Sequence, residues 1–330
     1  MAPLNRNPEA IAALIREAKT IAVCSHINPD GDTLGCAAAM RLALLRLGKD
    51  VSLFCDGKVP DQLSFLPGIS EMHSPAADRR HYDLLLSVDV SDPKRLGSCA
   101  ALLEKSTHTA QIDHHPTNPL FMEANWVDGT APAACLMIRE ILKVLRVGLD
   151  PELAVCLYTG ISTDTGNFAF ASTNAECFSV MSELMAQRLP LARLNRILFR
   201  DRARPQILLI NRALSSLQYH ANGQIAVMKL TRRDFQECDA LAEHADTVVN
   251  FGLDTVGTRM ALLAREEADS EGKAGIIKFS LRAKEPDSVN DIAQQFGGGG
   301  HPQAAGITMN GTLDGTTGLV LDAMIHKLNG

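Results

Sequence analysis

The sequence HINPDGD, from His26 to Asp32, follows directly on an apolar run, TIAVCS, at residues 20–25. The apolar run is short and contains β-branched residues, which predicts a buried strand, and the Gly-, Asp- and Pro-rich residues after it predict a loop. An Ala- and Leu-rich stretch at about residues 34–47 then predicts a helix. A strand, a polar loop and a helix in this order are typical of the first unit of an α/β sheet.

The same alternation continues along the first half of the chain. Further strands are predicted at residues 51–54, 84–88 and 109–112, and helices at about residues 131–145 and from residue 151 onward. Asp150 is placed to cap the last helix, with Pro151 in its first position. Strands that alternate with helices predict right-handed crossovers and a mostly parallel sheet.

Beyond about residue 188 the pattern changes. Predicted strands at residues 224–230, 259–265 and 275–281 are followed by a helix at 289–296 and the glycine run 297–300. The sequence therefore predicts two α/β domains: a mostly parallel sheet flanked by helices in residues 1–190, and a smaller mixed α/β domain in residues 206–330. Residues 191–205 are predicted to link them.

Composition and charge narrow the class of protein. The chain has 330 residues, of which 46% are apolar and 21% charged, and a net charge of −6. An acidic total argues against a protein that tracks long nucleic acid, because such binding depends on phosphate contacts. No apolar run is long enough for a membrane span, and the first residues lack the layout of a secretion signal, so we expect a cytoplasmic protein without membrane contact.

The cysteines and arginines add two observations. The eight cysteines are spread singly without a C-x-x-C pair, which favours buried, reduced thiols over a zinc or redox site. Residues 188–212 carry seven arginines and one acid, Asp201. These arginines either form a solvated helix and linker or hold substrate phosphates in a cleft.

Acidic residues and histidines gather where predicted elements end. In chain order, they are His26, Asp30 and Asp32, then Asp89, then Asp113, His114 and His115, and finally Asp164 in GISTDTG at 160–166. Each group alone has an ordinary explanation, such as an Asx turn or a helix cap. The loops past the carboxyl ends of parallel strands converge on one crevice, however, so four such groups predict a metal site. Carboxylate and imidazole ligands without a thiolate suit Mn²⁺ or Mg²⁺.

These motifs resemble those of the DHH/DHHA1 phosphoesterase family, and most closely its NrnA-like subgroup of small oligoribonucleases and 3′-phosphoadenosine-5′-phosphate (pAp) phosphatases. The resemblance rests on HINPDGD, SVDVSD, DHH and TDTG in the first half, and on FSLR and GGGGHPQAAG in the second. It implies an active site in the cleft between the two domains, and it allows a homodimer.

The resemblance also implies roles for single residues. His26, Asp30 and Asp89 would hold one metal ion, and Asp32, Asp89, His114 and Asp164 the other. Asp113 would orient an imidazole from behind the ligands. His115 would contact the scissile phosphate.

Two cations about 4 Å apart can share a hydroxide and make it available near neutral pH. We therefore expect a Mn²⁺-dependent phosphoesterase, with a metal-bridging hydroxide as the nucleophile. The resemblance implies that it cuts short RNAs of about two to five nucleotides to mononucleotides, and pAp to AMP and phosphate.

The second domain is predicted to bind the substrate. Without side chains, Gly298, Gly299 and Gly300 could bring backbone N–H groups close to a phosphate, with His301 next to them. Arg282 is the predicted cationic partner of a terminal phosphate. Arg259 is predicted to be either a companion of Arg282 or an exposed strand residue.

Other functions are left open or disfavoured. A soluble phosphodiesterase for linear or cyclic dinucleotides, of the c-di-AMP or pApA type, is the alternative within the family. A non-catalytic RNA-binding module is the alternative from another class, although such a module has no use for six ligands. A dehydrogenase is disfavoured, because NPDGD stands where G-x-G-x-x-G would bind a dinucleotide.

Overall fold

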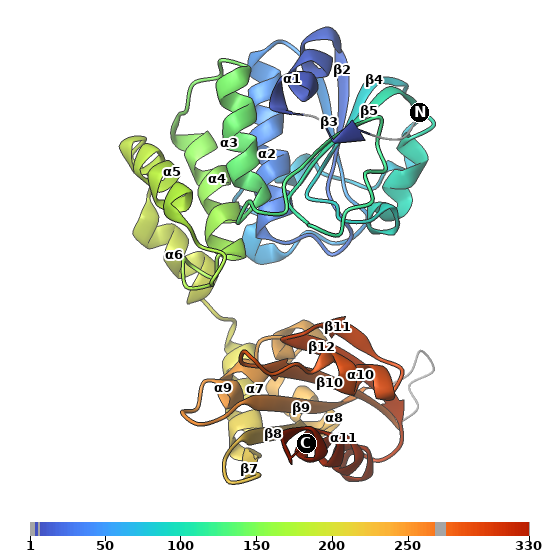
Figure 1. The fold of residues 1–330 in the computed structure, drawn as a ribbon, viewed down its shortest axis with the longest axis vertical. Coiled ribbons are helices and arrows are strands. Elements are labelled where there is room, and N and C mark those ends of the chain that lie inside the picture. The colour runs from blue at the N-terminus through green and yellow to red at the C-terminus, as the bar shows by residue number, and fades with distance from the viewer. Residues whose placement is uncertain (1–3, 6, 268–274, 330) are drawn as a thin grey trace. The chain divides into compact units, whose positions relative to one another are not determined.

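The computed structural model describes residues 4–5, 7–267 and 275–329, and the chain divides into two compact units, Met1–Asp201 and Arg202–Gly330 (Figure 1). The residues from which we predict the absence of a secretion signal lie partly outside the described ranges. The segment 191–205 contains helix α6 (Leu191–Phe199) and the start of helix α7 (Arg204–Ser215).

The first unit is built on a parallel sheet. Its described strands are β1 (Leu4–Asn5), β2 (Thr20–Cys24), β3 (Asp50–Phe54), β4 (Tyr82–Val88), β5 (Ser106–Asp113) and β6 (Ala124–Val127). They lie in the order β1-β6-β5-β4-β2-β3, and every pairing is parallel. The sheet prediction for this half of the chain is confirmed.

Side chains of both faces of this sheet are buried, as a parallel sheet requires. On β2, Ile21 and Val23 join the large core on one face, whereas Ala22 and Cys24 join a smaller core on the other. The helices of the first unit are α1 (Pro8–Glu17), α2 (Gly31–Arg46), α3 (Ala134–Val144), α4 (Pro151–Asp164), α5 (Ala175–Ala186) and α6, with 3₁₀ turns η1 (Asp61–Leu63), η2 (Ile69–Glu71), η3 (Pro75–Ala77) and η4 (Pro93–Leu102). Figure 1 shows α2, α3 and α4 side by side, and η4 packs on the smaller core.

The strand order reverses direction between β2 and β4. From β2 the chain first adds β3 on one side and then β4 on the other, so β2 and β4 are neighbours although β3 lies between them in sequence. Such a switch point leaves a crevice beyond the carboxyl ends of the two strands, where α/β proteins bind ligands. Asp89 directly follows β4, and His26 lies two residues beyond the end of β2.

The second unit contains a mixed sheet. Its described strands are β7 (Gln218–His220), β8 (Ile225–Leu230), β9 (Met260–Glu267), β10 (Ile276–Ala283), β11 (Gly299–His301) and β12 (Ala304–Asn310), in the order β11-β12-β10-β9-β8-β7. Only the β8–β9 pairing is parallel in this sheet as described. The helices are α7, α8 (Arg232–Cys238), α9 (Val249–Leu253), α10 (Asn290–Gln295) and α11 (Leu313–Asn329), with the 3₁₀ turn η5 (Ala242–Ala245).

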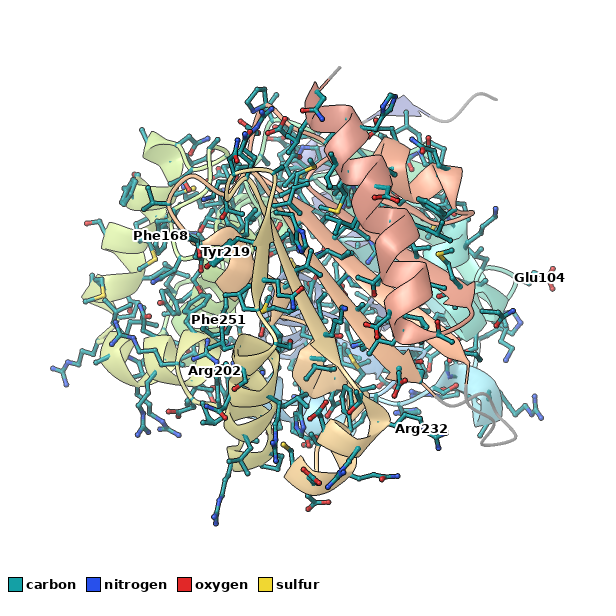
Figure 2. All side chains as sticks on the ribbon, turned by 90° about the horizontal axis from the view of Figure 1, so that it is seen from below. Glu104, Phe168, Arg202, Tyr219, Arg232 and Phe251 are labelled. Carbon is teal, nitrogen blue, oxygen red and sulfur yellow. The ribbon has the colours of Figure 1, made fainter. Side chains whose placement is uncertain are left out.

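Helices cover both faces of this sheet as well. Residues of α10 and α11 share one buried core with β9, β10 and β12, and residues of α7 and α9 share another with β8 and β9. At the β7 edge of the sheet, the Tyr219 hydroxyl lies 2.8 Å from the hydroxyl of Thr255, which follows helix α9. Figure 2 labels Tyr219 and the α9 residue Phe251. The prediction of a smaller mixed α/β domain in this half of the chain is confirmed.

Two further predictions concern the whole chain. All eight cysteines are buried and free, which confirms the prediction of reduced thiols. Among the described residues, none of the helices combines the length and apolar character needed to cross a lipid bilayer.

Candidate metal centre

The end of β2 and the start of α2 place the first three candidate ligands. His26 is almost fully buried just after β2. Asp30 caps α2, because its carboxylate accepts hydrogen bonds from the Asp32 and Thr33 amides, both at 3.1 Å. The Asx turn that the sequence allowed is therefore present, and it holds Asp30 and Asp32 on the first turn of one helix.

Asp89 occupies a constrained position after β4. It has a φ of 58°, in the left-handed region that residues other than Gly rarely adopt. Its amide donates to the Ile112 carbonyl at 2.9 Å, which fixes the residue against the next strand. Strain of this kind commonly occurs at functional sites, where the surrounding structure maintains it.

The six predicted metal ligands come together in two groups of three. His26 Nε2 lies 3.5 Å from an Asp30 oxygen and 3.6 Å from Asp89 Oδ2. His114 Nε2 lies 3.1 Å from Asp164 Oδ2 and 4.0 Å from Asp32 Oδ2. In each group the three ligand atoms lie within 4.8 Å of one another, as metal ligands do.

Asp89 lies between the two groups. Its Oδ2 faces His26, whereas its Oδ1 lies 3.4 Å from His114 Nε2. The structure thus brings Asp89 next to both imidazoles, the position that a carboxylate bridging two ions would occupy.

The concentration of buried carboxylates shifts the pKa values of the whole cluster. Burial raises the pKa of Asp89 to about 6. Burial, together with the charges of Asp164 and Asp89, raises the pKa of Asp32 well above its ordinary value. Burial opposes the protonation of His26 and His114, but their contacts with carboxylates prevail and raise the two pKa values to about 9 and about 10.

The donor set fits divalent cations. His26 Nε2 and Asp89 Oδ1 are buried and have no hydrogen-bond partner among the described residues, so a lone pair on each is left for another ligand. The remaining donors are carboxylate oxygens and one imidazole nitrogen, which favour Mn²⁺ or Mg²⁺ over ions that prefer thiolates.

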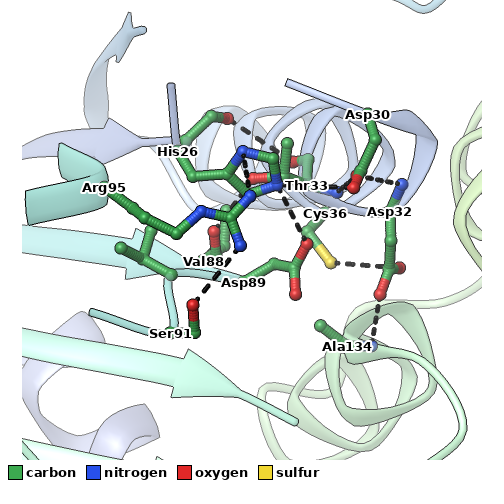
Figure 3. A network of polar contacts seen from close by, with 12 residues as sticks. His26, Asp30, Asp32, Thr33, Cys36, Val88, Asp89, Ser91, Arg95 and Ala134 are labelled. Atoms are coloured by element: carbon green, nitrogen blue, oxygen red, sulfur yellow. Dashed lines mark hydrogen bonds and ion pairs between the residues drawn. The ribbon is translucent and has the colours of Figure 1, made fainter. Parts of the chain in front are cut away.

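Helix α3 orients Asp32 from behind. The Ala134 and Cys135 amides, at the start of α3, donate to the two Asp32 oxygens at 2.5 Å and 2.9 Å (Figure 3). The positive end of the helix dipole therefore faces the carboxylate. A Cβ on Gly160 of α4 would overlap both Asp32 Oδ1 and Cys135 Sγ, so the close approach of these helices requires glycine there.

Asp113 orients His115 rather than the candidate ligand His114. Its Oδ1 lies 2.8 Å from His115 Nδ1, whereas His114 Nδ1 lies 3.0 Å from the Ala131 carbonyl. The orienting role expected for Asp113 therefore belongs to the imidazole predicted to meet the substrate, and His115 Nε2 is the atom left for it.

A network of side-chain amides supports Asp113. Asn118 Nδ2 donates to Asp113 Oδ2 at 2.6 Å, and Gln111 Nε2 donates to Asn118 Oδ1 at 3.0 Å. Gln111 also donates to Asn125, which is fully buried. Because side-chain amides accept and donate at fixed positions, this network of hydrogen bonds allows one orientation of the Asp113 carboxylate.

In the second unit, the glycine run forms a hairpin rather than a linker. Gly299–His301 is strand β11, which pairs with β12. The Gly298 amide already donates to the Ala293 carbonyl at 2.8 Å, and a Cβ on Gly298 or Gly300 would overlap the β12 backbone. Close backbone packing therefore explains these two glycines without a ligand, and the Gly298 N–H is not free for a phosphate.

The two predicted substrate arginines differ. Arg282 on β10 is half-buried, and burial lowers its pKa; no ion pair to a carboxylate is found for it in the described ranges. Arg259 instead forms a double contact with Asp287, at 2.6 Å and 2.8 Å, and also donates to Gln224. This pairing favours a structural role for Arg259 over contact with substrate.

The arginine-rich stretch is partly paired as well. Arg212 lies 2.8 Å from Glu237, and Arg196 lies 3.5 Å from Asp201. These two contacts favour the interpretation of a solvated helical segment for Arg196 and Arg212.

Sequence reasoning missed Arg95 and Asn118. Arg95 Nη2 lies 3.1 Å from His26 Nδ1, six residues beyond Asp89 in the chain (Figure 3). Asn118 follows DHH by three residues. Proximity to the acidic motifs was the only signal, because neither residue type is itself a preferred ligand of these ions.

Sequence comparison identifies the class. A profile of the DHH family, N-terminal domain, matches residues 20–161, and a profile of the DHHA1 domain matches residues 222–329. The chain belongs to the DHH family, with a DHHA1 domain as its second part.

Among relatives, the chain is 32% identical to the bifunctional oligoribonuclease and PAP phosphatase NrnA of Thermus thermophilus, over 93% of this chain and 90% of that protein. It is 25% identical to the protein of the same name from Bacillus subtilis, over 88% and 89%. Among solved structures, an exopolyphosphatase-related protein from Bacteroides fragilis has the same fold, with a TM-score of 0.88, 23% identity and coverage of 97% and 95%.

Proposed function

We propose that this protein is a divalent-metal-dependent phosphoesterase that hydrolyses short oligoribonucleotides to mononucleotides, and pAp to AMP and phosphate. The observation that carries the proposal is the cluster of six ligands in two groups of three, with Asp89 beside the imidazoles of both. The 32% identity to a bifunctional oligoribonuclease and PAP phosphatase, over nearly the whole of both chains, supports the substrate class.

We assign the two groups of ligands to two ions, with His26, Asp30 and Asp89 at one, and Asp32, Asp89, His114 and Asp164 at the other. Such ions lower the pKa of water and neutralise charge on a phosphoryl group. Mn²⁺ is the ion we expect, with Mg²⁺ as the alternative, because oxygen and imidazole donors are mixed.

The chain itself orients the substrate. Asp113 holds His115 Nδ1, so His115 presents Nε2 to the phosphoryl group. In the second unit we assign Arg282 and the exposed residues Gly299, Gly300 and His301 to the remainder of the nucleotide. A guanidinium that forms no ion pair within the described ranges is suited to a terminal phosphate.

The test is a comparison of substrates with Mn²⁺ present: pAp, RNAs from dinucleotide to pentanucleotide, a long single strand, a cyclic dinucleotide and pyrophosphate. We expect fast turnover of pAp and the short RNAs alone. Preference for the cyclic dinucleotide would move the protein to the phosphodiesterase alternative. Absence of turnover for every substrate would refute the catalytic function.

A further inference from the structure

Arg95 is a cation beside the candidate metal centre for which no role has yet been given. It lies in η4, which follows β4 and Asp89. Its Nη2 is 3.1 Å from His26 Nδ1 and its Nη1 is 3.3 Å from the Ser91 hydroxyl (Figure 3). The guanidinium therefore contacts the imidazole of a candidate metal ligand.

The backbone around Arg95 is fixed. The Ile27 amide donates to the Arg95 carbonyl at 2.8 Å, which ties η4 to the loop that carries His26. Asp92 caps the turn by accepting from the Lys94 amide at 2.8 Å. Gly97 has a φ of 54°, and a Cβ there would overlap Asp56 and Ile27. The position of Arg95 is thus set by local structure and not by the His26 contact alone.

The contact between Arg95 and His26 cannot be a hydrogen bond when a metal ion is bound. His26 Nε2 faces Asp30 and Asp89, so Nε2 would offer its lone pair to the ion. Nδ1 must then carry the hydrogen, and it lies 2.7 Å from the Ile27 carbonyl that accepts it. Arg95 and Nδ1 are then two donors facing each other.

The guanidinium is consequently left short of acceptors. Arginine has five N–H donors and stays charged, yet Ser91 Oγ is the neutral acceptor that remains. None of the ion pairs found in residues 7–267 and 275–329 involves Arg95. A partly buried guanidinium in this position is suited to an anion brought by the substrate, and phosphoryl oxygens match its planar fork.

We propose that Arg95 is a substrate-binding residue, which donates hydrogen bonds to a non-bridging oxygen of the phosphoryl group under attack. The proposal rests on the proposed function, because it places that phosphoryl group at the six-ligand cluster. Arg95 would act from the side of His26. His115, which is held by Asp113, would act as a second and separate substrate contact.

The experiment uses the full chain loaded with Mn²⁺ and inorganic phosphate as the probe. Arg95→Ala and Arg95→Lys are compared with Lys94→Ala, which removes the exposed neighbouring cation. Calorimetry gives the affinities for Mn²⁺ and for phosphate, and turnover of pAp gives kcat and KM. Circular dichroism verifies that each variant is folded, and Arg95→Gln serves if Arg95→Ala is not.

We expect Arg95→Ala to weaken phosphate binding about tenfold or more and to lower kcat about a hundredfold, because it removes charge-assisted hydrogen bonds at the reacting group. Its Mn²⁺ affinity should stay within about twofold of wild type, because Arg95 is not a ligand. Arg95→Lys should recover part of the phosphate affinity, and Lys94→Ala should match wild type.

Wild-type phosphate affinity in Arg95→Ala would overturn the inference. A loss of Mn²⁺ affinity with unchanged phosphate binding to the loaded protein would overturn it as well, because Arg95 would then only position His26. Phosphate calorimetry decides the question even if wild type hydrolyses none of the nucleotides. That outcome would refute the proposed function separately.

Discussion

At the residue scale, the site depends most on Asp89. It lies beside both candidate imidazole ligands and in a left-handed backbone conformation. Its place after an apolar strand could be predicted from sequence, because loops at the carboxyl ends of parallel strands converge. Its conformation could not, because a φ of 58° at Asp depends on the contact of its amide with β5.

We predict that Asp89→Asn lowers kcat at least about a hundredfold, even at full Mn²⁺ occupancy, since an amide cannot supply the second anionic oxygen between two ions. The matched control is Asp83→Asn, at the opposite end of β4, whose carboxylate accepts from the Lys19 and Thr20 amides. This control should retain wild-type kcat. Activity that survives in loaded Asp89→Asn would contradict the assignment.

We expect Asn118 to act as a positioning residue, with an effect that passes through Asp113 to His115. We predict that Asn118→Ala lowers kcat about tenfold with little change in Mn²⁺ affinity, because Asp113 loses one of its fixed donors. A double-mutant cycle provides the test: in a His115→Ala background, Asn118→Ala should cost nothing further. Additive losses would show that Asn118 acts elsewhere.

At the scale of elements, the sequence predicts those that carry a clear period. Strands β2 and β4 are apolar runs, and α4 begins after the predicted cap, Asp150. Strand β12 was missed because its start, Ala-Ala-Gly, has little strand propensity; pairing with β10 makes it a strand. The amide network behind Asp113 was missed because Gln111 and Asn125 come to face each other only when β5 and β6 pair.

The close packing of α2, α3 and α4 gives a prediction at this scale. Gly160→Ala would push a methyl group against Asp32 and Cys135, so the helices or the Asp32 carboxylate must move. We expect Mn²⁺ affinity to fall about tenfold and the melting temperature to drop. Gly148→Ala, where a Cβ meets nothing within 4 Å, is the control and should change neither quantity. Unchanged Mn²⁺ affinity in Gly160→Ala would contradict the role given to this packing.

At the scale of the whole molecule, the first unit holds all six candidate ligands. The contribution of the second unit to substrate binding, through Arg282 and the β11 hairpin, is our proposal. The order of the acidic motifs and the change of pattern near residue 190 could be read from the sequence, because both depend on local composition. The charge balance of the cluster could not, because it arises from residues nearly 140 positions apart that meet only in the fold.

That charge balance predicts how metal binding and stability depend on pH. In the metal-free protein, the pKa values of His26 and His114 are raised to about 9 and about 10, from an ordinary value near 6.5. The stability contributed by their protonated forms is therefore complete below about pH 6.5 and is lost as the pH rises toward 9 or 10. Asp89, with a pKa raised to about 6, acts in the same direction at lower pH, because the fold favours its protonated form.

Metal binding has the opposite dependence, because the ions must displace these protons. We predict that the melting temperature of the metal-free protein falls between pH 6.5 and pH 9, and that the gain from saturating Mn²⁺ is larger at pH 8.5 than at pH 6.5. Thermal scans of the metal-free and loaded protein at several pH values measure both effects. The His26→Gln/His114→Gln variant should lose most of the pH-dependent gain, whereas His108→Gln, which removes an exposed partner of Glu123, should keep it. An equal Mn²⁺ gain at both pH values would mean that the imidazoles are not the groups that the ions deprotonate.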